Sequence, residues 1–263
     1  MPENPVIAKF GKASGAIGPV GTPGSADLQR MYDAPSYSGP RTTVRYMTLD
    51  DVVVRTAAML AVIFATGAVA WTTVNTANAR PLLIVSLMGG LGLGLYMSFT
   101  MKANAVTALL YSAFEGALLG AISRAFNDAY PGIVIQALTG TVCVAGGMLI
   151  VYKTGAIRVT PKFTRVLVGA TIGVFGLMLV NLIAYLFHPG GLGLRNGGAL
   201  AIVFSLICIG VAAMSLVWDF DMIEKAIRTG ADHKFAWYAS FGLMVTLIWL
   251  YIEILRLLSY LRE

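Results

Sequence analysis

Acidic residues stand inside the long apolar runs of this sequence, where charge is costly. Glu115 lies in "YSAFEGALLG", Asp219 and Asp221 lie in "SLVWDFDMIEKAI", and Glu253 lies in "LIWLYIEILRLL". An ionisable group in hydrocarbon usually faces a bundle interior or a water-filled cavity, and it commonly marks the path of an ion or a proton. The chemistry open to these carboxylates is therefore to bind a cation or to exchange a proton within a membrane.

Glu115 and Glu253 lie at different depths of their apolar runs. Glu115 is ten residues from either end of its run, so at ~1.5 Å per residue it lies near the bilayer midplane. Glu253 is eighteen residues into the last run, and Arg256 at i+3 can pair with it on one helix face. Each acid either binds an ion along a pathway or is a packing residue that a local partner neutralises.

Asp219 and Asp221 mark the end of the sixth apolar run. Residues two apart on a helix point about 160° apart, so only one of the two faces the bundle easily. Lys225 follows Asp221 at i+4 and favours a solvated pair there, which leaves Asp219 as the inward candidate. Arg55 is predicted to pair with Asp219 and seal this end, and protonation of the acid would weaken the seal.

Carboxylates at three levels predict a pathway for a cation or a proton. Asp219 would lie nearest the cytoplasm, Glu115 midway, and Glu253 towards the outside. Such a ladder conducts only if its helices share one lumen. On this hypothesis Glu115, Glu253 and Asp221 line the ion pathway, and Asp219 can hold a calcium ion transiently.

Seven apolar runs position these acids, each near the ~20 residues that a helix needs to cross a bilayer. They are Val52–Val74, Leu82–Met101, Ala105–Ala125, Ile133–Tyr152, Val166–Phe187, Gly198–Trp218 and Phe235–Leu258. The runs do not alternate as barrel strands do, so residues 47–263 are predicted to form an all-α, seven-transmembrane-helix polytopic bundle. Composition agrees, because 57% of the residues are hydrophobic and only 12% are charged, about half the usual charged share.

Residues 1–46 differ from the rest of the chain. They are rich in Gly, Pro and Ser and show no period, which predicts a disordered cytoplasmic tail. Thr48 with Asp51 three positions later resembles a capping box, so the first helix is expected to begin there. "GGLGLG" at 89–94 and "GALLG" at 116–120 lie inside apolar runs, which predicts close helix packing and not a nucleotide site.

Basic residues in the loops predict the orientation in the membrane. With a cytoplasmic tail, thirteen Lys and Arg lie inside and four outside, leaving aside Arg55 and Arg256 within the runs. This places the N-terminus in the cytoplasm and the C-terminus outside. No basic stripe with interleaved aromatic residues occurs, so nucleic acid is not an expected partner.

Motifs for catalysis or tight metal binding are missing from the sequence. No HExxH, GxSxG, P-loop or paired-cysteine motif occurs. Cys143 and Cys208 lie in apolar runs and are predicted to be packing residues. The sequence therefore predicts no enzyme, no cofactor and no resident metal.

Two stretches give the sequence a resemblance to a known family. "VWDFDMI" closes the sixth run, and "ASFGLMVTLIWLYIEILRLLSYL" forms the last. Together with the seven runs, over roughly residues 50–260, they make the chain resemble the bacterial branch of the Bax inhibitor-1 family. That resemblance implies a pH-sensitive leak for calcium or other cations, in which an Asp ending the sixth span pairs with an Asp on the last span.

The resemblance implies a gate role for Asp219, which matches the first of the two family acids. Thr246 stands where the second acid belongs, so this chain departs from the carboxylate pair. Thr246 could still hydrogen-bond Asp219, and Arg55 or Lys102 could supply its charged partner. These four residues are the expected gate.

A non-transporting role is the alternative. In it the buried charges only specify helix packing, and residues 1–46 recruit a membrane protein partner, such as a membrane protease or a stress-response system. An intramembrane hydrolase built on Asp219 would need a second acid at matching depth, and Thr246 denies it one.

Overall fold

The computed structural model describes residue 29 and residues 45–75, 79–188 and 190–262. Nearly all of the predicted cytoplasmic tail, residues 1–46, lies outside the described residues. The unit that begins at Arg45 contains every candidate acid.

Seven long helices make up the described part of this unit. They are α3 (Leu49–Thr73), α4 (Ala79–Thr100), α5 (Ala105–Ala129), α6 (Ile133–Lys153), α7 (Pro161–Phe187), α8 (Gly198–Arg228) and α9 (Phe235–Tyr260). Each is long and apolar enough to cross a membrane, and many large apolar side chains lie exposed on their outer faces. The predicted all-α polytopic bundle is confirmed, and its outer surface requires a lipid environment.

Helix α3 begins at the predicted capping box. The Thr48 hydroxyl accepts from the Asp51 backbone N–H at 3.2 Å, and the Asp51 carboxylate accepts from the Thr48 N–H at 3.1 Å. Two of the free N–H groups at the helix start are thereby satisfied. Arg45 adds an ion pair to Asp51 at 2.9 Å.

Helix α8 is longer than the sixth apolar run. The apolar run ends at Trp218, but the helix continues ten residues further, to Arg228. Pairs at i,i+4, such as Asp221 with Lys225, stabilise the added turns while Ile223 is buried. The helix ends at Arg228, and Gly230 two residues later has a φ of 69°, which suits a glycine stop. Asp219 and Asp221 therefore both lie inside a helix, as the i,i+4 pair of Asp221 with Lys225 expected from the sequence requires.

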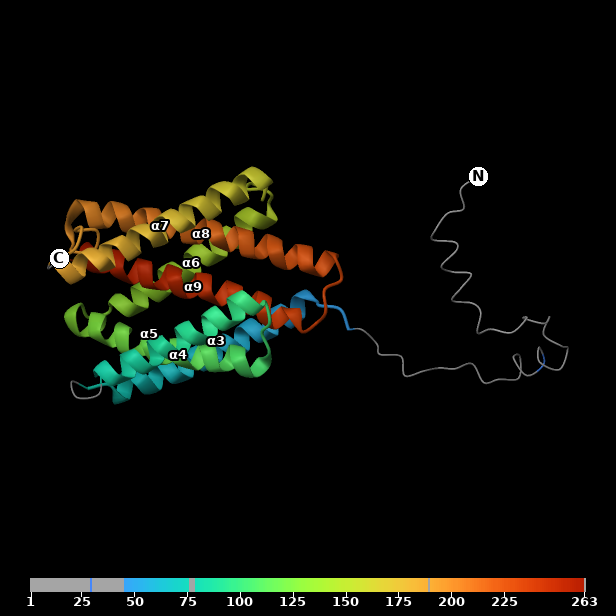
Figure 1. The fold of residues 1–263 in the computed structure, drawn as a ribbon, viewed down its shortest axis with the longest axis horizontal. Coiled ribbons are helices and arrows are strands. Elements are labelled where there is room, and N and C mark those ends of the chain that lie inside the picture. The colour runs from blue at the N-terminus through green and yellow to red at the C-terminus, as the bar shows by residue number, and fades with distance from the viewer. Residues whose placement is uncertain (1–28, 30–44, 76–78, 189, 263) are drawn as a thin grey trace, which may run out of the picture. The chain divides into compact units, whose positions relative to one another are not determined.

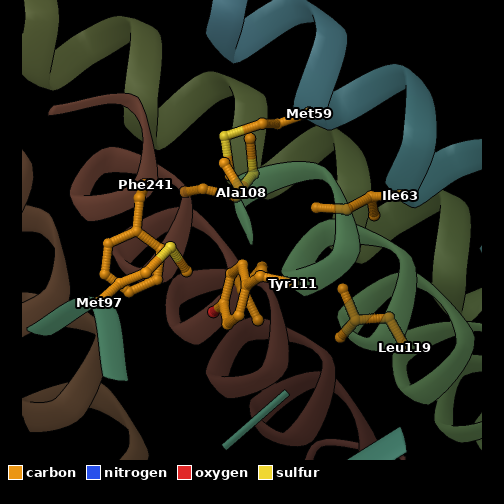
Figure 2. Packing of buried hydrophobic residues seen from close by; sticks show 9 residues of the cluster. Met59, Ile63, Met97, Ala108, Tyr111, Leu119 and Phe241 are labelled. Atoms are coloured by element: carbon orange, nitrogen blue, oxygen red, sulfur yellow. The ribbon is translucent and has the colours of Figure 1, made fainter. Parts of the chain in front are cut away.

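Helix α9 occupies the centre of the bundle. It packs against α3, α5, α6 and α8, while α4 packs on α5 and α7 on α8. Figure 1 shows α3, α4 and α5 together on one side of α9, with α7 and α8 on the other. Buried side chains of α3, α4, α5 and α9 form one core, including Met59, Met97, Tyr111 and Phe241 (Figure 2). A second core joins α6, α8 and α9.

Glycines bring α3 and α5 into close contact. A Cβ added to Gly120 would stand 2.3 Å from the Gly67 carbonyl oxygen, and one added to Gly116 would stand 2.6 Å from the Ile63 carbonyl oxygen. No other residue fits at these positions without moving a helix. The predicted role of "GALLG" in helix packing is confirmed.

Candidate functional site

Asp219 lies buried between α8 and α9. Asp219 is only 4% exposed. Its Oδ2 accepts a hydrogen bond from the Thr246 hydroxyl at 2.7 Å. The two helices run antiparallel around the turn at Gly230, so Asp219, nine residues before the end of α8, meets Thr246, eleven residues after the start of α9. The structure thus brings these two predicted gate residues together.

No basic side chain of the described residues lies within ion-pair distance of Asp219. Leu216 and Ile223, which lie one turn before and one turn after it on α8, are apolar and buried. A buried carboxylate without a counter-charge is costly, so this site favours whichever partner, proton or cation, removes its charge.

Arg55 does not pair with Asp219, contrary to the prediction. Its guanidinium donates to the His233 carbonyl oxygen, lies 3.9 Å from Asp51, and sits 5.3 Å from the centre of the Trp237 ring. It lies in the second turn of α3 and points to the α8–α9 turn, away from the Asp219 level of α8. Arg55 therefore links the start of α3 to the α8–α9 turn and to the start of α9.

Lys102 does not supply the charged partner either. It lies exposed in the short connection between α4 and α5, where its side chain is free to reach solvent. The expectation that Arg55 or Lys102 neutralises Asp219 was wrong, because depth along a helix does not fix the direction of a side chain.

Asp221 lies on a polar strip of α8 that faces away from Asp219. It forms the predicted i,i+4 ion pair with Lys225 at 2.5 Å. One turn further, Glu224 pairs with Arg228 and accepts from the Tyr152 hydroxyl of α6. This strip joins α6 to α8 at the end of the bundle that holds the α8–α9 turn.

Asp232 occupies that turn, outside the helices. Its carboxylate accepts from the Lys234 backbone N–H at 2.8 Å, and this hydrogen bond, with His233 and Lys234 nearby, holds the pKa of Asp232 below its ordinary value. Tyr46 forms an isolated antiparallel bridge with Asp232, and the Met47 N–H donates to the Ala231 carbonyl oxygen at 2.8 Å. The segment before α3 is thereby tied to the turn between α8 and α9.

Glu115 lies half-buried between α4 and α5. Its carboxylate reaches Gly90 of α4, where an added Cβ would stand 2.8 Å from Oε1. Tyr111 precedes it by one turn on α5, so its side chain lies on the same face of that helix. Glu115 thus faces protein, but its neighbours belong to α4 and α5 and not to the α8–α9 contact of Asp219.

Glu253 is held by two guanidinium groups. It is only 2% exposed, and its Oε1 lies 3.2 Å from Arg195 and 3.6 Å from Arg256. The pair with Arg256 was predicted at i+3. Arg195 was missed, because it lies in the connection between α7 and α8 and no sequence spacing links it to α9. The Tyr260 hydroxyl donates to the Arg195 carbonyl oxygen at 3.2 Å and helps to hold that connection.

The acids therefore lie in three separate surroundings. A cavity of about 760 Å³ lies between α3, α5, α6 and α9, and a second of about 490 Å³ lies between α7 and α8. Neither is lined by Glu115, Asp219 or Glu253. The structure does not bring the predicted ladder of carboxylates to either cavity.

A passing cation would find few ligands at any one acid. Within the described residues, no three or more His, Cys, Asp or Glu side chains gather closely enough to hold a metal ion. At Asp219 a cation would meet one carboxylate and the Thr246 hydroxyl. Such a site suits brief contact with calcium more than tight binding, because calcium takes six to eight oxygen ligands.

Comparison with known families matches nearly the whole chain. A family model described as "Bax inhibitor 1 like" matches residues 7–263, further towards the N-terminus than the stretch 50–260 expected from the sequence. No curated protein matches the chain.

Proposed function

Because the chain belongs to the Bax inhibitor 1 like family, we propose that it is a pH-sensitive leak for calcium or other cations. It would act in a bacterial inner membrane, with the N-terminus in the cytoplasm and the C-terminus outside. Asp219 and Thr246 would form the gate between α8 and α9.

One observation carries the proposal: Asp219 is buried with a hydroxyl as its hydrogen-bond partner and no counter-charge among the described residues. Loss or gain of a proton there changes the charge of the α8–α9 contact by one unit. The packed contact tolerates the neutral form best, because a buried carboxylate without a counter-charge is costly. Ionised Asp219 would draw in water or a cation, and the two helices would part.

The path on either side of the gate would use the remaining predicted acids. Asp221 stands towards the cytoplasmic end and would attract cations to the mouth. Glu253 lies towards the other end, where Arg195 and Arg256 compensate it in the structure. The leak would therefore need these ion pairs to rearrange, and Glu115 would contribute only if the path extends to α4 and α5.

Calcium flux into liposomes tests the proposal. The full chain is reconstituted around a fluorescent calcium indicator, and influx is measured over a pH series. Asp219→Asn is expected to abolish the pH dependence, whereas Asp50→Asn, the same change at an exposed acid of the first α3 turn, should preserve it. Unchanged pH-dependent flux in both Asp219→Asn and Glu115→Gln would remove the basis of the proposal.

A non-transporting role keeps one specific observation in its favour. Each buried acid has local partners, and two guanidinium groups hold Glu253, as expected of charges that specify helix packing. In that role residues 1–46 would recruit a membrane protein partner. Deletion of residues 1–46 would then abolish capture of the partner in a pull-down, whereas a leak would keep its flux after the deletion.

A further inference from the structure

The larger of the two cavities described above is not lined by Asp219 or Thr246. Residues of α3, α5, α6 and α9 line it, together with Phe220 of α8. The hydroxyls of Ser123 and Tyr251, which line it, bond each other at 2.7 Å, and the Thr141 hydroxyl bonds the Ala137 carbonyl oxygen of its own helix at 2.8 Å. The Thr72 hydroxyl likewise bonds carbonyl oxygens of its own helix. Because these hydroxyls have partners and most of the lining is apolar, the cavity suits hydrocarbon and not water.

The cavity is elongated and opens towards the bilayer. Its α3 wall runs from Leu60 to Thr72, about 18 Å of helix at the standard rise, and one leaflet of hydrocarbon is about 15 Å thick. Phe64 of α3 and Val142 of α6 line it yet are 54% and 64% exposed. The volume of about 760 Å³ lies within the range of ordinary ligand sites.

The positively charged side chain of Arg124 lies beside one end of the cavity. Ser123 and Trp71 line that end, and Arg124, the residue after Ser123, donates to the Trp71 carbonyl oxygen. The Arg124 side chain remains 34% exposed and lies 3.8 Å from Asp128, which is itself 70% exposed. A guanidinium presents a planar fork of donors that matches a phosphate.

We propose that this cavity binds one acyl chain of a bilayer phospholipid, with the anionic phosphate of that lipid at Arg124. The apolar walls supply affinity for the chain, and Arg124 supplies a preference for anionic headgroups. This inference goes beyond the proposed leak and does not depend on it.

Two adjacent glycines of α6 provide a matched test. Gly146 lines the cavity and Gly147 does not, and an added Cβ meets nothing within 4 Å at either position. Gly146→Leu should therefore fill the cavity without a clash, whereas Gly147→Leu adds the same side chain elsewhere on the helix. The full chain is reconstituted in vesicles of phosphatidylethanolamine and phosphatidylglycerol, extracted in mild detergent, and examined by native mass spectrometry.

The wild-type chain should retain phosphatidylglycerol, and Gly146→Leu should reduce that retention about tenfold, a loss equivalent to about 1.4 kcal/mol. Gly147→Leu should retain lipid as the wild type does. Ala68→Leu, on the opposite wall of the cavity, repeats the test with Ala65→Leu as its control and decides the matter if Gly146→Leu does not fold. Arg124→Gln should remove the preference for phosphatidylglycerol over phosphatidylethanolamine.

Equal retention by the cavity-filling variants and their controls would overturn the proposal, as would a wild-type chain that retains no phospholipid. Lipid retention and calcium flux are separate readouts, so failure of this inference is distinguishable from failure of the leak.

Discussion

Asp219 and Glu253 are two carboxyl groups buried to the same degree in one pair of neighbouring helices, yet their partners differ. Asp219 is bonded by the neutral hydroxyl of Thr246, whereas Glu253 lies against the guanidinium groups of Arg195 and Arg256. A carboxylate between two cations is stable as an ion, and removal of its charge would leave the cations buried without a partner. A carboxyl group beside one hydroxyl has no positive charge nearby to stabilise its ionised form. On the proposed function, Glu253 would carry a fixed, structural charge and Asp219 an exchangeable one.

Glu253→Gln should give the largest loss of stability. It leaves Arg195 and Arg256 about three-quarters buried without their acid, and breaking a buried pair costs about 3–5 kcal/mol. Because both side chains are partly exposed, we expect the lower end, about 3 kcal/mol. Unfolding by SDS in mixed micelles measures it, with Asp128→Asn, which breaks an exposed pair, as a control expected to cost under about 1 kcal/mol. A cost below that of the control would refute the structural role of Glu253.

Thr246→Val should have the second largest effect. It removes the only hydrogen bond to the Asp219 carboxyl group that the described residues provide, and a buried group left unsatisfied costs about 1–3 kcal/mol. Thr139→Val is the matched control, because the exposed Thr139 hydroxyl bonds only the Ile135 carbonyl oxygen of its own helix. The same SDS titration should separate the two variants; indistinguishable curves would mean that Thr246 does not support Asp219.

Asp219→Asn should cost less than either change. The side-chain oxygen of asparagine still accepts from the Thr246 hydroxyl and no cation is left unpaired, so we expect a loss of at most about 1 kcal/mol. Measuring Asp219→Asn and Glu253→Gln in the same unfolding assay compares the two buried acids directly. Equal losses of stability would mean that the two acids do not differ in their structural roles.

The turn at Asp232 should show the smallest effect, confined to acid conditions. Its pKa is lowered in the folded chain, so its stabilising bond to Lys234 is present above the ordinary pKa of about 3.9 and is lost as the pH falls through the lower folded value. Amide hydrogen exchange at Lys234 should therefore speed up at acid pH relative to neighbouring amides, after correction for intrinsic rates. In Asp232→Asn this acid-dependent change should vanish; its persistence would assign it to another group.

The sequence predicted the elements better than the contacts between them. Continuous apolar runs located all seven helices, and Thr48 with Asp51 located the first residue of α3. The sixth apolar run stops short of the end of α8, because ion pairs and one buried face hold the last turns of that helix. A run of residues records depth in the membrane, but it does not record the rotation of a helix about its axis.

That missing rotation explains the outcomes at the candidate site. Arg55 was predicted to face Asp219 from its depth alone, and it faces the α8–α9 turn instead. Thr246 was located through the family resemblance, which carries information on which helix faces meet. Arg195 lies in a connection and reaches Glu253 only through the folded path of the chain, so no local pattern could have indicated it.

Infrared difference spectroscopy of the carboxyl band tests the central claim most directly. The spectrum of the reconstituted wild-type chain minus that of Asp219→Asn isolates the Asp219 carboxyl group, and the matching difference with Glu253→Gln isolates Glu253. We predict that the Asp219 band changes over the same pH range in which calcium flux changes, while Glu253 shows an ionised carboxylate throughout. A constant Asp219 band across that range would contradict an exchangeable proton at the α8–α9 contact.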